Sequence, residues 1–213
     1  MIKNITIPKQ KICVPDLNSD ANYGVGCRTG SLAGKFLVAT PSLSMQESCF
    51  TRAVVYMCAH NESGAMGIII NYPVENVKVD DVMEQVNIKT NARHDFPVYF
   101  GGPVESNRGF IIHSDDVVAN GIISRQDGVV VTSNADILQS IADGRGPKQT
   151  LLALGYAGWT AGQLESEMES GSWIIVSATK QLLFETDNEM KWGLAIASLG
   201  FDVGHFSNAV GHA

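Results

Sequence analysis

Residues 53–71 read AVVYMCAHNESGAMGIIIN, and this stretch decides the fold class. Two apolar runs rich in β-branched residues, 53–60 and 65–71, flank the polar segment NESG. This pattern is typical of a β-hairpin, and here it predicts a hairpin with a four-residue loop. Because both runs are almost continuously apolar, we expect strands that are covered on both faces.

Further strand-like runs lie on both sides of this hairpin, and several of them also come in pairs. Short apolar segments bounded by Gly, Pro, Asn or Asp are predicted to be strands. They are GKFLVAT (34–40), PVYFGGP (97–103), GFIIH (109–113), a hairpin at 121–132 that turns at Gln126–Gly128, TLLALGY (150–156) and SWIIVSA (172–178).

Helical periodicity appears between and after these strands. We expect helices at 77–86, at 134–143 and at 186–200, with Ser133 capping the second helix and Gly144 ending it. Hairpins interspersed with helices, without strict strand–helix–strand alternation, favour an α+β fold with mixed sheets over a doubly wound fold. We predict a flexible N-terminal extension at 1–30 and a single domain at 31–213.

Composition and charge exclude several classes of function. The chain has 213 residues and a formal net charge of −7, and no cluster of Lys or Arg provides a surface for DNA or RNA. Direct nucleic-acid binding is therefore not expected. No apolar run approaches the ~18 residues of a transmembrane helix, and the first thirty residues lack a signal-peptide core. We expect a cytoplasmic protein whose cysteines (Cys13, Cys27, Cys49 and Cys58) are free thiols.

The segment GYAGWTAGQLESEM, residues 155–168, offers the strongest candidate for a functional turn. Its glycines permit close backbone approach, and Tyr156 and Trp159 are large amphipathic rings ahead of a helix. Such a turn could hold an anion or a backbone carbonyl, or the rings could fill the core while the glycines make room for them. Thr160 and Gln163 have the spacing of a capping box, which predicts that the helix starts at Thr160.

The carboxylates of this predicted helix do not form a catalytic pair. Glu165 and Glu167 are two positions apart and point to different sides, so the spacing does not support hydrolysis by paired carboxylates. Gln163 and Glu167, four positions apart, share one face. His60 and His113 each end a predicted strand and could bind a metal together with Glu165 or Glu167, but no spacing requires it. We therefore assign no metal, no cofactor and no catalytic residue.

Three glycine-containing turns, at 60–67, 101–103 and 155–163, lie at predicted strand ends and could converge on one groove. GGP at 101–103 could form a backbone nest for an anion, or be a tight turn made rigid by its proline. The candidate groove residues are His60, Gly64, Gly67, Asn71, Gly101, Gly102, Pro103, His113, Gly155, Tyr156, Gly158, Trp159, Gln163, Glu165 and Glu167.

The same motifs carry a family resemblance. Five motifs follow one another along the chain: GKFLVATPSL, HNESGAMGIIINYP (60–73), FPVYFGGPVESNRGFIIH (96–113), LGYAGWTAGQLESEM (154–168) and the closing W-x-x-A-x-x-x-LG helix (192–200). In these motifs and in their order the chain resembles the AlgH/YqgE family of largely uncharacterised bacterial proteins. The resemblance implies a cytoplasmic single-domain α+β protein with strongly curved mixed sheets flanked by helices. It also implies a label as transcriptional regulator, and a gene neighbourhood that contains an RNase H-like nuclease, a candidate protein partner. The family offers no catalytic residues to carry over.

Two functional hypotheses follow, and a third is weaker. The first is a non-enzymatic binding or regulatory protein that recognises a protein or peptide partner, with any effect on transcription being indirect. The alternative is a protein or enzyme that binds a small anionic ligand through the three glycine-rich turns. The weakest is a DNA-binding transcriptional regulator, because no helix-turn-helix with a basic second helix is present.

Overall fold

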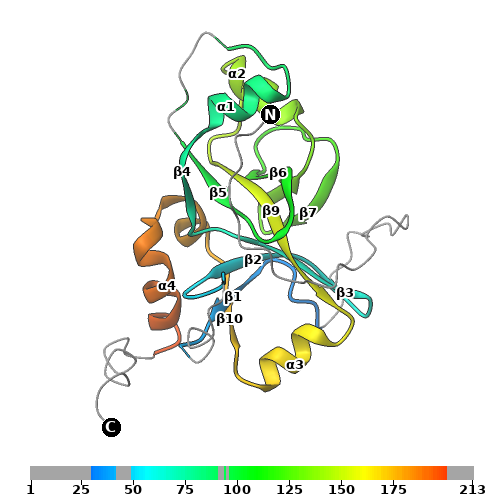
Figure 1. Cartoon of the computed structure of the whole chain (residues 1–213), viewed down its shortest axis with the longest axis vertical. Helices are drawn as coiled ribbons and strands as arrows, with labels where there is room; N and C mark the ends of the chain where they lie inside the picture. Colours follow the sequence, from blue (N-terminus) through cyan, green and yellow to red (C-terminus); the bar gives the residue numbers. More distant parts are fainter. Residues whose placement is uncertain (1–29, 42–48, 91–93, 95, 201–213) are drawn as a thin grey trace.

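The computed structural model describes residues 30–41, 49–90, 94 and 96–200, and the predicted extension at 1–30 lies outside them except for its last residue. Within these ranges one ten-stranded sheet forms the body of the protein, with the order β10-β1-β2-β3-β9-β6-β8-β7; β5 pairs with β9 and β4 with β5. All pairs are antiparallel except β5–β9, which is parallel. The sheet curls, and helices flank it (Figure 1). The prediction of an α+β fold with mixed, curved sheets is confirmed.

The hairpin at 53–71 is present, with a shorter loop than predicted. β2 continues through Asn61 and β3 begins at Gly64, which leaves two residues between the strands instead of four. The strands that build this part of the sheet are β1 (Lys35–Ala39), β2 (Val54–Asn61), β3 (Gly64–Ile69) and β10 (Trp173–Ser177).

β9 (Thr150–Thr160) is the strand that joins the two ends of the molecule. Its first half pairs with β5 and β6, and its second half pairs with β3. Figure 1 shows it running from the end that carries α1 and α2 to the end that carries α3. The part of the sheet around this first half also contains β4 (Pro73–Lys78), β5 (Pro97–Phe100), β6 (Val104–Ser114), β7 (Ile122–Gln126) and β8 (Val129–Thr132).

The helices are shorter than the sequence predicts. They are α1 (Val79–Gln85), α2 (Asp136–Ala142), α3 (Gln163–Glu169), a π-helix η2 (Gln181–Glu185) and α4 (Asn188–Ala197). The region predicted as one helix at 77–86 begins as β4, because residues 77 and 78 complete a strand that pairs with β5.

Two predicted helix starts were wrong. The residue before α2 is Ala135 rather than Ser133, and the side chain of Asn134 accepts a hydrogen bond from the backbone N–H of Asp136. α3 begins after Gly162, which has a left-handed φ of 75°, instead of at Thr160. Gln163 still reaches back as a capping-box residue would, since its Oε1 accepts from the backbone N–H of Thr160 at 3.0 Å.

Buried side chains form three clusters around the sheet. One lies beneath α4 and η2 and includes Phe36, Tyr56, Tyr156 and Trp192. A second lies beneath α3 and contains both Trp159 and Trp173. The third lies beneath α1 and α2. The first two clusters use opposite faces of β1, β2 and β3, which confirms that these strands are covered on both sides.

No helix in the part of the chain that the structure describes is long and apolar enough to cross a membrane.

Candidate functional site

The three glycine-containing segments all lie along β9, but they contact it over different residues. Gly64 lies opposite Thr160, whereas Gly101 contacts Gly155. Thr160 lies five residue steps along β9 from Gly155, which corresponds to about 16 Å. The nearer ends of the segments do meet, because Gly67 pairs with Ala157 and a Cβ at Gly102 would lie 2.4 Å from the backbone nitrogen of Ala157; at this point backbone packs against backbone.

The predicted turn GYAGW lies within β9, and this part of the prediction was wrong. Gly155 has φ +75° inside the strand, and a Cβ there would lie 2.4 Å from the carbonyl oxygen of Gly102. Gly158 pairs with Met66 of β3. The glycines thus permit a close approach between two backbones, and the neighbouring strands take up the N–H groups that a turn would have aimed outward.

Tyr156 and Trp159 face the interior instead of a groove. Their relative exposures are 1% and 3%, and the ring of Tyr156 packs edge-on against Phe110 at 5.6 Å between centroids. Both rings fill the core, which is one of the two alternatives that the sequence left open; the other was a turn that holds a ligand. They are unavailable to grip a partner unless the core opens.

The GGP segment forms a tight connection between β5 and β6 in which the main-chain groups of Gly101 are already engaged. The N–H of Gly101 donates to the carbonyl of Leu154, and its own carbonyl accepts from the N–H of Ile69, both at 2.8 Å. Gly102 has φ +151°, and a Cβ there would lie 2.1 Å from the carbonyl carbon of Tyr156. Pro103 is half-buried beside it. An anion nest needs free N–H groups, and that of Gly101 is not free.

His60 and Glu165 form the hydrogen-bonded pair that joins the hairpin to α3. Nε2 of His60 lies 2.7 Å from Oε1 of Glu165, and this contact holds the pKa of the Glu165 carboxyl below its ordinary value. Nδ1 of His60 accepts a hydrogen bond from the backbone N–H of Leu32 at 3.2 Å. Since Nδ1 is occupied as an acceptor, Nε2 carries the proton and donates to the carboxylate. Neither nitrogen is then free to act as a general base.

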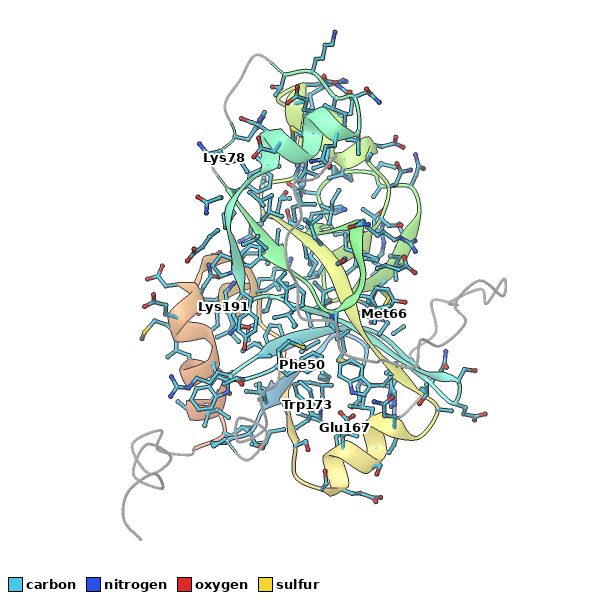
Figure 2. All side chains as sticks on the ribbon, in the orientation of Figure 1. Phe50, Met66, Lys78, Glu167, Trp173 and Lys191 are labelled. Atoms are coloured by element: carbon cyan, nitrogen blue, oxygen red, sulfur yellow. The ribbon has the colours of Figure 1, made fainter. Side chains whose placement is uncertain are left out.

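Glu167 is held by two indoles. Its Oε2 accepts from Nε1 of Trp159 at 2.9 Å and from Nε1 of Trp173 at 2.8 Å, and its Oε1 accepts from the side-chain amide of Gln163. The two indole rings are perpendicular, with centroids 5.8 Å apart. Figure 2 shows Glu167 of α3 turned toward the sheet, near Trp173. Gln163 and Glu167 share a face and Glu165 points elsewhere, as the spacing predicted.

His113 lies at the other end of β9. It pairs with Thr150, ten strand residues or about 33 Å from Thr160, and so cannot join His60 and Glu165 at one metal. Its Nδ1 donates to the carbonyl of Ser114 at 2.8 Å, and burial lowers its pKa. Among the described residues no group of three or more His, Cys, Asp or Glu side chains could hold a metal ion.

The remaining predicted residues have structural contacts. Asn71 joins two segments, because its Oδ1 accepts from the N–H of Val54 and its Nδ2 donates to the carbonyl of Arg52. A Cβ at Gly67 would lie 2.5 Å from Val55, and one at Gly64 would lie 2.2 Å from the carbonyl oxygen of Trp159. Cys49 and Cys58 are free thiols as predicted, while Cys13 and Cys27 lie outside the described residues.

Lys191, which no sequence motif marked, is the one buried Lys, Arg, Asp or Glu among the described residues. It is 2% exposed, and its ammonium group donates to the carbonyls of Ile70 and Leu183 at 2.9 and 3.1 Å and lies 5.3 Å from the ring centre of Tyr99. Desolvation lowers its pKa to about 8. Its spacing of four from Ala195, on the buried face of α4, was the signal available in the sequence.

An open pocket of about 520 Å³ lies at the end of β6, near His113, and was also not predicted. Its two ammonium groups, of Lys148 and Lys180, form no ion pair with any described residue, whereas Asp116 accepts from the Ser114 hydroxyl and the Lys148 N–H. The lining residues are Ser114, Asp115, Asp116, Gly128, Lys148, Gln149 and Lys180.

The fold and these contacts define the class of protein: a single curled α+β body in which the predicted polar site residues His60, Asn71, Gln163, Glu165 and Glu167 bond to neighbouring segments. Comparison with known proteins agrees. The model of the AlgH-like family matches residues 36–204. UPF0301 proteins of Bradyrhizobium diazoefficiens and of Jannaschia are 42% and 44% identical, over 86% and 87% of this chain and 89% and 97% of theirs.

Solved structures give the same result. The solution structure of AlgH from Pseudomonas aeruginosa superposes with a TM-score of 0.71 at 33% identity, covering 88% of this chain and 99% of that one. Protein DIP2367 of Corynebacterium diphtheriae shares the fold, with a TM-score of 0.64 at 22% identity over 83% of this chain and 91% of that one. The chain belongs to the AlgH-like family.

Proposed function

We propose that this protein is a non-enzymatic, cytoplasmic binding protein that recognises a protein or peptide partner, and that any effect on transcription is indirect. The observation that carries this proposal is the hydrogen bonding of His60. A histidine–carboxylate pair serves as a general base only when its second nitrogen is free to take a proton. Here the N–H of Leu32 occupies that nitrogen.

The other candidate chemical groups support the same reading. Glu167 is bound by two indoles and an amide, and His113 is fully buried about 30 Å along β9 from the His60 pair. Because His60, Glu165 and Glu167 are all engaged by neighbouring groups, we infer that the protein acts on its partner by contact. Because the net charge is −7, we infer that electrostatic attraction favours basic partners over nucleic acid.

The RNase H-like nuclease whose gene neighbours family members is the first partner to test. Purified chain and purified nuclease from the same genome are mixed, and their association is measured by calorimetry at two salt concentrations. We expect a saturable complex of micromolar or better affinity. If the nuclease does not bind, and if crosslinked extracts of the native cells give no stoichiometric partner that binds again in purified form, the proposal is wrong.

A second candidate function is binding of a small anionic ligand, which the pocket beside Lys148 and Lys180 favours. The carboxylates that line it already accept hydrogen bonds or pair with Arg125, while neither ammonium group has an ion-pair partner among the described residues. Thermal-shift measurements with phosphate, nucleotides and phosphorylated metabolites test it. A saturable stabilisation that disappears in Lys148→Ala/Lys180→Ala would favour this function, and a flat response would remove it.

A further inference from the structure

Three strands in the described part of the sheet have a hydrogen-bonded neighbour on one side only: β4, β7 and β10. An edge strand presents unpaired N–H and C=O groups to which another chain can add, and natural proteins protect such edges with charges, prolines or bulges. The three edges of this protein can therefore be compared with one another.

Two of the edges carry this protection. β4 contains Pro73, Glu75 and Lys78, and its register shifts along its pairing with β5. β7 contains Arg125, has a register shift between Ile122 and Ser124, and packs against β2. Both edges are thus poor templates for a further strand.

β10 carries none of these features. Its sequence is WIIVS, without charge or proline, and it pairs with β1 through five consecutive residues without a shift. Ile175, at its centre, is 42% exposed. This edge is regular, apolar and uncharged, which is the combination that invites strand addition.

The register identifies which main-chain groups face outward. The N–H of Thr40 donates to the carbonyl of Ser172, so in the antiparallel ladder Ile174 and Val176 also bond to β1. The N–H and C=O groups of Trp173, Ile175 and Ser177 consequently point away from β1. No hydrogen bond to them is found among the described residues.

Charges of opposite sign lie toward the two ends of this edge. The acidic helix α3, which contains no Lys or Arg, ends at the exposed Glu169, four positions before Trp173. At the other end Lys35 lies opposite Ser177 on β1, and no ion pair of Lys35 is found within the described ranges. An added strand would meet negative potential near Trp173 and positive potential near Ser177.

We propose that the β10 edge is the docking site for an extended segment of a partner protein, which adds antiparallel to β10 with an apolar residue opposite Ile175. A basic side chain of the segment lies opposite Trp173 and an acidic one opposite Ser177. This inference rests on the proposed function and names the surface by which the partner is recognised. It uses β-strand addition, in which main-chain hydrogen bonds supply affinity and alternate side chains supply specificity.

A peptide fits this edge better than a second copy of the chain does. A strand of five residues buries far less than the roughly 1,200 Å² that a stable dimer needs, while short edges suffice for added peptides. Two copies would also each bring a net charge of −7. A basic segment encounters no such repulsion.

The test uses the full chain and the peptide acetyl-Thr-Glu-Thr-Ile-Thr-Arg-Thr-amide as a probe, followed by NMR of the amide groups. We expect saturable binding, with shifts and slowed exchange at the amides of Trp173, Ile175 and Ser177. Exchanging the Glu and the Arg of the probe keeps its composition and should weaken binding. Methylating the amide nitrogen of the probe's Ile removes one ladder hydrogen bond and should raise the Kd by about tenfold.

The matched variants are Ile175→Pro and Ile175→Thr. Proline at 175 removes only an outward N–H and none of the bonds to β1, so this variant should fold and lose the probe, whereas Ile175→Thr should retain it. Absent or unselective binding of the probe by the wild-type chain, or unchanged binding by Ile175→Pro, would overturn the inference. So would a dimer of the free chain in sedimentation that Ile175→Pro abolishes, because the occupant would then be a second copy.

Failure of this docking site can be distinguished from failure of the proposed function. That function is tested on whole partner proteins with the wild-type chain, and a partner that binds wild type and Ile175→Pro with equal affinity would sustain the function while removing this docking site. Conversely, binding of the probe at β10 without any protein partner would contradict the proposed function alone.

Discussion

The ammonium group of Lys191 donates a hydrogen bond of 2.9 Å to the carbonyl of Ile70, although 121 residues separate them in the chain. A second bond, to Leu183, connects the same group to η2. A buried charge without a carboxylate partner is costly, and here two carbonyls and the ring of Tyr99 compensate it in part. Lys191 thus joins the C-terminal helices to the end of β3.

Lys191 should make stability rise with pH under alkaline conditions. Its pKa is about 8 in the folded protein and ~10.4 when unfolded, so between these values the unfolded chain binds more protons and the free energy of unfolding increases with pH. The contribution is absent below pH 8, and its upper bound is about 3 kcal/mol. Tyr56 and Cys58, whose pKa values are raised by burial, act in the opposite direction.

The comparison of wild type with Lys191→Met isolates this effect. At pH 7 the variant leaves two buried carbonyls unpaired but removes a desolvated charge, and we expect a net loss of about 1–2 kcal/mol. Urea unfolding at intervals from pH 7 to 10 should show the difference between the two proteins growing with pH. A difference that is constant across this range would contradict the assigned titration.

Glu167 should be the most sensitive side chain of α3. Glu167→Ala removes the acceptor of two indole N–H groups, and bonds to a charged acceptor contribute ~1.5–3 kcal/mol each, so we expect a loss of roughly 3 kcal/mol. Glu167→Gln keeps an acceptor oxygen and should cost about 1 kcal/mol. Chemical unfolding followed by circular dichroism measures both. Glu169→Ala, an exposed position on the same helix, is the control, and equal losses in the two alanine variants would refute the role of Glu167.

Some of these contacts could be anticipated from the sequence because they are local. Gln163 and Glu167 are four residues apart in a helix, and that spacing alone places them on one face. The hairpin at 53–71 was found because long apolar runs on either side of a polar turn have few alternatives. Both predictions depend on neighbours along the chain.

The parts that were missed depend on distant partners. The second half of β9 has the composition of a turn. It is a strand because β3 pairs with it, and because a glycine at 155 lets the backbone of the GGP segment approach closely. β4 contains Pro73 and Asn76, which are poor strand formers, and pairing with β5 overrides this preference. The hydrogen bonds from the Trp173 indole to Glu167 and from the Leu32 N–H to His60 could not be predicted, because no sequence periodicity relates the residues of either pair.

The tautomer of His60 provides a direct check on the proposed absence of catalysis. Because Nδ1 accepts from Leu32, the neutral ring should carry its proton on Nε2, and ¹⁵N chemical shifts of the ring nitrogens will distinguish the two tautomers. A proton on Nδ1 would mean that Nδ1 does not accept from Leu32 and that the unprotonated Nε2 faces the Glu165 carboxyl, and the non-enzymatic proposal would lose its main support.

The pair should also contribute to stability at neutral pH. The pKa of Glu165 is lowered in the folded protein, so its contribution is present above the unfolded pKa of ~4.3 and is lost as pH falls through the lower folded value. The carboxylate is largely exposed, which limits the effect to within ~1 kcal/mol. Unfolding of wild type and Glu165→Gln should therefore differ at pH 7 and converge toward pH 3. A difference that persists in acid would have another cause.

Gly102 and Gly144 should separate the effect of close backbone approach from that of backbone conformation. Both have positive φ, but a Cβ at 102 would lie 2.1 Å from backbone atoms of Tyr156, while at 144 no atom outside its chain neighbours lies within 4 Å among those described. Gly144→Ala should cost about 1 kcal/mol, the usual penalty of a left-handed alanine. Gly102→Ala must also push β9 away from the GGP segment, and we expect a loss above 3 kcal/mol or failure to fold. Thermal unfolding and soluble yield measure both variants side by side. Similar behaviour of the two would show that the GGP segment can move away from β9, and it would return that segment to consideration as a site whose N–H groups open to a ligand.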